Sequence, residues 1–247
     1  MFRQDGRNPD QIREIKVSKN YLKFPEASVL IETGGTKIIC TATIIEQQVP
    51  SYLQGSGRGW ITAEYSMLPR ATLARTSRTK INLGGRTQEI QRIIGRALRA
   101  VVDPFLLGER TILIDCDVLQ ADGSTRTTAI NGGYIVLVEA IKKLKEEGRI
   151  ALLPVKDYLA AVSVGICDEE IILDLTYGED SRAQVDLNIA MTGRGNLVEI
   201  QGTAEERSFS FEELNRMFKV AKKGINEIIK LEKEICGEIG SSFGNTE

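Results

Sequence analysis

The stretch "RTILIDCDVLQADGSTRTT" (residues 110–128) contains a strand, a glycine turn and the beginning of a helix. Apolar side chains alternate with acidic ones over residues 109–120, which is the period of a half-buried strand. Small hydroxyl residues and glycine follow, and the apolar period then changes to that of a helix, predicted from near Thr127 to about Lys145. A strand that leads into a helix in this way is typical of folds that mix both elements.

The rest of the chain repeats this arrangement. Residues 27–46 predict two strands joined at Gly34–Gly35, because two β-branched runs flank a glycine pair. A strong amphipathic helix follows "RTQE" and ends before Pro104. The further predicted elements are a hairpin at 159–176, strands at 183–192 and 197–203, and a helix that begins at Ser210 with a capping box.

Strands followed by a helix, twice over, predict a single α/β (α+β) domain across residues 1–247. Its N-terminal half covers about 1–150 and its C-terminal half about 151–247, with Pro154 opening the second half. Duplication of one half is a hypothesis, since the two halves share no visible sequence identity. The last residues, "GSSFGNTE" (240–247), are expected to fray.

Composition predicts a globular protein of the cytoplasm. Hydrophobic residues make up 42% of the chain, and no stretch approaches the roughly 20 apolar residues of a membrane span. The N-terminus lacks the apolar segment of a signal peptide. Four scattered cysteines are expected to be buried free thiols, which indicates a reducing compartment.

Charge is distributed unevenly along the chain. The net charge is −2, yet residues 70–99 contain eight basic residues and one acid and therefore carry +7, which leaves −9 for the remainder. Arginine dominates this segment, which favours bidentate contacts with phosphate groups. The segment thus predicts a binding site for a polyanion. A solvated helix face is the alternative, and structural roles are expected for Arg96 and Arg99.

The chain contains no histidine. Nucleophiles activated by histidine, histidine general bases and histidine metal sites are therefore excluded. Catalysis has to rely on carboxylates, cations, hydroxyls or a metal ion held by oxygen atoms.

Two turns predict a phosphate site. In one, Ser124, Thr125 and Arg126 lie where a strand gives way to a helix, so backbone N–H groups, hydroxyls and a guanidinium are expected to converge there. In the other, the glycine pair of "GGRT" (84–87) places Arg86 just before the arginine-rich helix. The alternatives are an ordinary N-cap with an outward arginine and a plain glycine loop.

Two aspartates predict a cation site. Asp186 lies in an apolar-alternating strand and Asp180 in the turn before it, and oxygen ligands of this kind suit Mg²⁺. An Asx turn beside a strand-edge acid is the alternative. Together with the two turns, the pair indicates phosphoryl or nucleotidyl transfer, which depends on positioning and charge neutralisation. Phosphorolysis fits a chain without histidine, because inorganic phosphate is already an anion at neutral pH.

Long motifs of the chain resemble the bacterial ribonuclease PH family. They are "GWITAEYSMLPRAT" (59–72), "GRTQEIQRIIGRALRAVVD" (85–103), "ERTILIDCDVLQADGSTRT" (109–127) and "LDLTYGEDSRAQVDLNIAMTG" (173–193), together with "DGR" (5–7) and "EIQGTAEERSFS" (199–210). The resemblance covers essentially the whole chain. Polynucleotide phosphorylase and exosome ring subunits share the fold that it implies, a ribosomal protein S5 domain 2-like fold with mixed sheets and a C-terminal helix.

The resemblance implies an activity and its partners. The expected reaction is phosphate-dependent 3′-to-5′ trimming of tRNA precursors beyond the CCA end, with release of nucleoside diphosphates. The reverse reaction adds nucleotides, and a role in rRNA processing is a further possibility. The expected assembly is a homohexamer, a trimer of dimers.

The resemblance also implies roles for particular residues. Phosphate binding maps onto Arg86, Ser124, Thr125 and Arg126, and catalysis with Mg²⁺ maps onto Asp180 and Asp186. RNA binding maps onto Arg70, Arg75 and Arg78, and Arg92 on the following helix is a further candidate for RNA. Ser124 replaces the family's usual glycine, and the segment between Arg70 and Arg86 is about two residues shorter than usual.

Two alternative functions remain open on sequence alone. Metal-dependent hydrolysis would use Asp180 and Asp186 but leaves Arg86 and Arg126 without a clear role. A catalytically inactive ring subunit that only binds RNA is the second alternative, and the presence of both phosphate turns and both aspartates argues against it.

Overall fold

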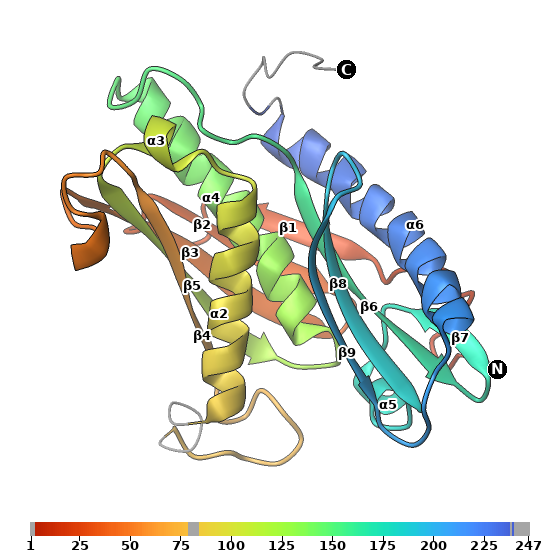
Figure 1. Cartoon of the computed structure of the whole chain (residues 1–247). Coiled ribbons are helices and arrows are strands. Elements are labelled where there is room, and N and C mark those ends of the chain that lie inside the picture. Colours follow the sequence, from red (N-terminus) through yellow and green to blue (C-terminus); the bar gives the residue numbers. More distant parts are fainter. Residues whose placement is uncertain (1–2, 79–83, 238, 240–247) are drawn as a thin grey trace.

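The structure is a computed structural model that describes residues 3–78, 84–237 and 239. It contains two β-sheets with helices between and beside them (Figure 1). The first sheet has the strand order β1-β2-β3-β5-β4, in which β4 and β5 are parallel and the other neighbours antiparallel. Its strands are β1 (Ile15–Lys19), β2 (Ala27–Thr33), β3 (Thr36–Glu46), β4 (Trp60–Met67) and β5 (Arg110–Gln120).

The second sheet lies in the C-terminal half and is antiparallel throughout, with the order β7-β6-β8-β9. Helix α6 packs along one face of it, and its apolar stripe from Met217 to Ile229 is buried there. The elements of this half are β6 (Leu159–Cys167), β7 (Glu170–Leu173), α5 (Tyr177–Asp180), β8 (Val185–Thr192), β9 (Leu197–Ala204) and α6 (Phe211–Cys236).

The helices of the first half are α2 (Gly85–Ala100), α3 (Pro104–Leu107) and α4 (Thr125–Glu146), with a short 3-10 turn, η1 (Ser51–Leu53). Helix α4 lies between the sheets and contacts β2, β3 and β5 of the first and β6 and β8 of the second. Its side chains are buried on all sides from Thr127 to Val138. At Gly132 a Cβ atom would lie 2.7 Å from the sulfur of Cys40, so a glycine allows this close approach.

The fold predicted from the sequence is confirmed in its main elements. The strands of 27–46 and 109–120, the hairpin after Leu159, the last two strands and the capped C-terminal helix are all present. Helices α2 and α4 begin a few residues earlier than predicted. Their first turns are polar, so the apolar period on which the prediction rests does not extend into them. The prediction missed β1 and β4, and the expected fraying of 240–247 lies outside the described residues.

The turn that carries Asp180 is helical. The sequence predicts Asp180 in the turn before the strand of Asp186, and in the structure it is the last residue of the one-turn helix α5. The Thr176 side chain accepts from the backbone N–H of Glu179, and the Glu179 side chain accepts from the backbone N–H of Thr176. This capping box satisfies the N–H groups at the start of the turn and fixes the backbone that carries Asp180.

Two further expectations concern membranes and thiols. Within the described ranges, no helix is both long and apolar enough to cross a bilayer. All four cysteines are buried and free, and Cys40 and Cys116 lie opposite each other on β3 and β5 with their sulfur atoms 3.7 Å apart.

Glu232 on α6 carries a carboxyl group that is buried in the core. Its residue is 1% exposed, and neither carboxylate oxygen has a partner of good geometry within the described part of the chain. Burial raises the pKa of Glu232 well above its ordinary value, although the backbone N–H of Leu159 counteracts the shift. Burial in the core therefore disfavours the charged form of this carboxyl group.

Glu232→Gln is expected to remove a pH-dependent loss of stability. A carboxyl whose pKa is raised on folding contributes stability only below its unfolded pKa, and that contribution is lost as pH rises toward the folded pKa. Relative to the variant, the wild type should lose up to about 1.4 kcal/mol of unfolding free energy per pH unit above the ordinary pKa. Denaturant unfolding of both proteins from pH 5 to pH 8 measures this difference. Glu234→Gln, on the exposed side of the same helix, is the matched control; a difference that does not change with pH would contradict the account.

Candidate functional site

A cleft of about 940 Å³ brings together the predicted phosphate turns and the predicted acidic pair. The first turns of α2 and α4 form one side of it, and α5, β8 and β9 form the other. Arg86, Ser124, Thr125, Arg126, Asp180 and Asp186 all line this cleft. Segments that are far apart in the sequence thus meet at the lower end of the molecule in Figure 1.

The start of α4 has backbone N–H groups without a side-chain cap. Its N-cap, Ser124, has the left-handed φ of 52° and makes no side-chain cap to the helix. Among the described residues, the N–H groups of Thr125, Arg126 and Thr127 therefore have neither an intrahelical carbonyl nor a capping side-chain oxygen. Aligned N–H groups at the beginning of a 22-residue helix attract an anion.

The Ser124 hydroxyl is already engaged within the protein. It lies 2.9 Å from Oδ1 of Asp174 and 2.7 Å from Oγ of Ser163. The carbonyl of Leu175 lies 3.1 Å away. Asp174 and this carbonyl can only accept, so Ser124 donates its one proton to them and accepts from Ser163. The phosphate-binding role of Ser124 stays a prediction, and a contact of Ser124 with an anion would use its backbone.

Two guanidinium groups meet in the cleft. Arg126 is half-buried and donates to the Gln201 side chain, which in turn donates to Glu89. Burial lowers the pKa of Arg126, and the nearby charge of Arg86 lowers it further. The two positive charges repel each other, and an anion bound between them would reduce this repulsion.

The two aspartates also act on each other. Oδ2 of Asp186 accepts from the Asn188 amide at 3.2 Å, while the buried Oδ1 has no partner among the described residues. Burial raises the pKa of Asp186 to about 6, and the Asp180 carboxylate contributes to that shift. Burial also raises the pKa of Asp180, although Arg86 and Arg126 act in the opposite direction.

This acidic pair fits a hard cation that keeps most of its water. Across the described chain, no three Asp, Glu or Cys side chains converge as a ready-made metal centre. A Mg²⁺ ion is commonly held by one or two carboxylates together with water and substrate phosphate. The unpartnered oxygen of Asp186 and the mutual repulsion of the two carboxylates are the features that such an ion would relieve.

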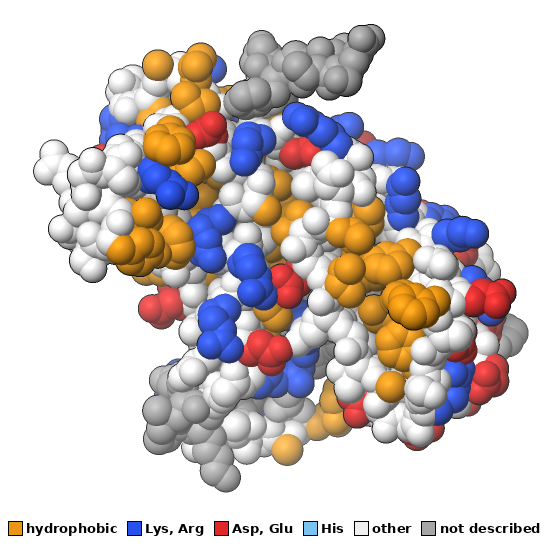
Figure 2. Space-filling view, viewed as in Figure 1, with side chains coloured by type: hydrophobic (Ala, Val, Ile, Leu, Met, Phe, Trp, Pro, Cys, Tyr) orange, Lys and Arg blue, Asp and Glu red, His pale blue; other side chains and the backbone are white. Residues whose placement is uncertain are grey.

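The predicted RNA-contacting arginines lie outside the cleft. Arg70, Arg75 and Arg78 are exposed on the segment after β4, and Arg92 is exposed on α2. Thr72 from that segment lines the cleft, so the segment borders its rim. Lys80 of the basic stretch lies outside the described residues. Lys and Arg side chains gather over α2 on the face shown in Figure 2.

Arg96 and Arg99 contact the chain itself, as expected for structural residues. Arg96 forms a bidentate ion pair with Glu199 at 3.0 Å and so ties α2 to β9. Arg99 lies over the ring of Trp60 at 4.2 Å and donates to the carbonyl of Ile61. Both pairs form within one chain.

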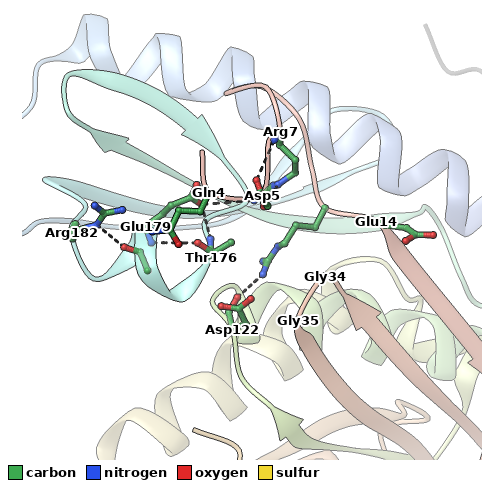
Figure 3. Close-up of a pocket in the computed structure, with 12 residues that line it drawn as sticks. Gln4, Asp5, Arg7, Glu14, Gly34, Gly35, Asp122, Thr176, Glu179 and Arg182 are labelled. Carbon is green, nitrogen blue, oxygen red and sulfur yellow. Dashed lines mark hydrogen bonds and ion pairs between the residues drawn. The ribbon is translucent and has the colours of Figure 1, made fainter. Parts of the chain in front are cut away.

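Sequence analysis missed a buried ion network behind the cleft. Arg3 pairs with Glu179 at 2.7 Å, and Arg13 pairs with Asp174 at 2.6 Å, with both acids buried. A second cavity of about 480 Å³ opens on this side, and its lining includes Arg7, Glu179 and Asp122 (Figure 3). The signal in the sequence was an aspartate between Leu173 and Leu175 in an otherwise apolar run, which predicts a buried charge that requires a cation.

Comparisons with known proteins agree on one family. Residues 11–142 match the family model "3′ exoribonuclease family, domain 1", and residues 157–224 match "3′ exoribonuclease family, domain 2". Ribonuclease PH of Bacillus cereus (strain G9842) is 56% identical over 243 residues, covering 97% of this chain and 99% of the relative. Ribonuclease PH of Bacillus mycoides (strain KBAB4) is 55% identical over the same length and coverage.

Solved structures show the same fold at low identity. Rice (Oryza sativa) Rrp46 matches with a TM-score of 0.77 and 19% identity, covering 95% of this chain and 100% of that one. The Archaeoglobus fulgidus exosome with RNA bound to the active site matches with a TM-score of 0.74 and 21% identity, covering 94% and 92%.

Asp186→Asn is expected to raise the melting temperature at pH 8. The pKa of Asp186 is raised to about 6 in the folded chain, so the folded state is destabilised once the pH exceeds the ordinary value of 3.8. The amide carries no charge and avoids this cost, so the gain should be largest above pH 6 and shrink toward pH 4. Calorimetry of both proteins across this range measures it, and equal melting temperatures at pH 8 would refute it.

Proposed function

Because the chain belongs to the ribonuclease PH family of 3′ exoribonucleases, we propose that it trims RNA from the 3′ end with inorganic phosphate as the attacking group. The enzyme is a phosphate-dependent nucleotidyltransferase. Its substrates in this proposal are tRNA precursors, trimmed beyond the CCA end. The observation that carries the proposal is the single cleft in which two guanidiniums, an uncapped helix start and two carboxylates meet.

The geometry supports phosphorolysis in particular. Arg86, Arg126 and the backbone at Ser124 and Thr125 hold orthophosphate beside the last linkage of the strand. A phosphate oxygen forms a bond to the terminal phosphorus, and the bond from that phosphorus to the 3′ oxygen of the preceding nucleotide breaks. The last nucleotide leaves as a diphosphate, and the shortened strand keeps a 3′ hydroxyl, which takes up a proton. Phosphate needs no base to become a nucleophile, which fits the absence of histidine from the sequence.

Asp180 and Asp186 are the proposed catalytic carboxylates and the proposed ligands of Mg²⁺. When bound there, the ion neutralises charge on the scissile phosphate. The carboxylates have to be ionised to hold it, so Asp186, with its pKa raised to about 6, limits the acid side of the reaction.

The exposed arginines are proposed to bind the body of the RNA. Arg70, Arg75 and Arg78 follow β4 at the rim of the cleft, and Arg92 continues the positive surface on α2. The proposed assembly is a ring of six chains, a trimer of dimers, and the solved Archaeoglobus relative is an exosome. The same proposal places the enzyme in the cytoplasm, where the thiols of its four buried cysteines stay reduced.

Trimming is expected to require inorganic phosphate and to release nucleoside diphosphates. A tRNA with a short 3′ extension, incubated with and without phosphate, tests this, with the products separated by chromatography. Release of nucleoside monophosphates without phosphate would establish hydrolysis instead.

Asp186→Asn should bind this RNA but trim it at least about 100-fold more slowly, since it removes a proposed metal ligand. Wild-type rates in the variant would remove Asp186 from the catalytic centre.

Charge reversal at Arg70 or Arg75 is expected to weaken tRNA binding selectively. Each such arginine that contacts a phosphate contributes about 0.7–0.9 to the slope of log affinity against log salt, so the variants should show a shallower slope. Phosphorolysis of a short oligonucleotide, which does not reach the rim, should be unchanged. Arg216→Glu, exposed on α6, is the control. Equal losses on tRNA and on the short oligonucleotide would place Arg70 and Arg75 in the catalytic centre.

A further inference from the structure

Ser124 has a backbone conformation that is unusual for its residue type. A serine at an N-cap ordinarily has extended backbone and accepts a hydrogen bond from an N–H of the first helical turn. Here φ is 52° and ψ is 26°, a left-handed conformation that glycine adopts freely and other residues adopt rarely. An ordinary serine cap would occupy an N–H group that an anion could use. The left-handed conformation leaves these groups uncapped.

The hydroxyl of Ser124 is held by a chain of buried groups. The backbone N–H of Leu175 donates to Ser163 at 3.0 Å, Ser163 lies 2.7 Å from the Ser124 hydroxyl, and that hydroxyl donates to Asp174 at 2.9 Å. Asp174 is 4% exposed and also has a left-handed φ of 52°. The conformation of one turn is thus fixed by an acid from the opposite half of the fold.

Arg13 fixes Asp174 in turn. Its guanidinium donates to both carboxylate oxygens, at 2.6 and 2.8 Å, and its backbone N–H donates to one of them at 2.8 Å. The remaining nitrogen of the guanidinium donates to the carbonyl of Asp122, two residues before Ser124. Arg13 therefore contacts the turn directly and also through Asp174. Asp122 lies at the wall of the second cavity, behind the cleft (Figure 3).

We propose that the Arg13–Asp174 ion pair is a positioning device that holds Ser124 left-handed and so keeps the first N–H groups of α4 open for inorganic phosphate. Neither member of the pair lines the cleft, so neither is a catalytic residue. The inference rests on the proposed function, because it gives that phosphate its backbone site. It also accounts for the serine at a position where a glycine would need no such support.

The comparison of Ser124→Ala with Ser124→Gly tests the role of the backbone. Alanine loses the hydroxyl and keeps a side chain that disfavours φ of 52°, so the KM for phosphate should rise about tenfold. Glycine loses the same hydroxyl but adopts this φ without strain, so its KM for phosphate should stay within about threefold of the wild type. The KM for RNA should change less than twofold in both. Equal losses in the two variants would make the hydroxyl a direct ligand and overturn the proposal, and so would no loss in either.

Asp174→Asn tests the ion pair itself. The amide keeps the shape of the side chain but loses the charge that orients Arg13 and Ser124, so the KM for phosphate should rise about tenfold or more. Asp10→Asn is the matched control. Asp10 lies in the same N-terminal segment as Arg13, and it pairs with Lys223 at the surface. A KM for phosphate in Asp174→Asn equal to that in the control would overturn the proposal. If this variant fails to fold, the comparison of Ser124→Ala with Ser124→Gly still tests the proposal.

A binding measurement separates this inference from the proposed function. Inorganic phosphate without RNA should raise the melting temperature of the wild type, relative to chloride at equal ionic strength, and should do so less in Ser124→Ala than in Ser124→Gly. If the wild type trims RNA only with phosphate while the variants keep its phosphate affinity, the inference alone fails. If trimming needs no phosphate, the proposed function fails.

Discussion

The site depends on the free N–H groups in the first turn of α4. Helix α4 is buried between two sheets, and a buried helix start normally needs a capping side chain because unsatisfied polar groups are costly away from water. Here the N-cap residue Ser124 makes no side-chain hydrogen bond to the helix, and the first residues of the helix line the cleft. The remaining parts of the site, two guanidiniums on one side and two carboxylates on the other, are arranged around this opening.

The cleft brings like charges together within each of its two pairs, the arginines and the aspartates. Arg86 lowers the pKa of Arg126, and Asp180 raises the pKa of Asp186. Like charges brought together in this way reduce the stability of the folded protein, and the repulsion is relieved when an anion and a cation bind between them. In the network behind the cleft, the buried acid Asp174 is paired with a cation. Burial alone would raise the pKa of Asp174, but its ion pair with Arg13 outweighs that effect and holds the pKa below its ordinary value.

Most of the architecture was predictable because hydrophobic periodicity determines it. The alternating strand at 109–120 and the helix after it have strong periods, and so does the capped helix from Ser210. The position of Asp180 was predicted less well, since a single helical turn is too short to have a period, and a reciprocal cap at Thr176 and Glu179 defines it. Residue type and spacing also predicted that the two turns and the two aspartates share one pocket, and all of them line the cleft. What could not be predicted is the partner of the Ser124 hydroxyl. It comes from Asp174, and the contact exists only after both halves of the chain have packed together.

The N-terminal segment forms hydrogen bonds and ion pairs with residues that come late in the sequence. The backbone of Pro9 accepts a hydrogen bond from Leu173, Arg3 donates to the carbonyls of Leu173 and Asp174, and Arg13 grips the Asp174 side chain. A chain emerging from the ribosome presents its first residues long before these partners are made, because synthesis proceeds from the N-terminus at about 5–20 residues per second. The opening at α4 therefore acquires its final shape only when nearly three quarters of the polypeptide has been translated. An incomplete nascent chain therefore lacks the finished opening that we propose holds phosphate.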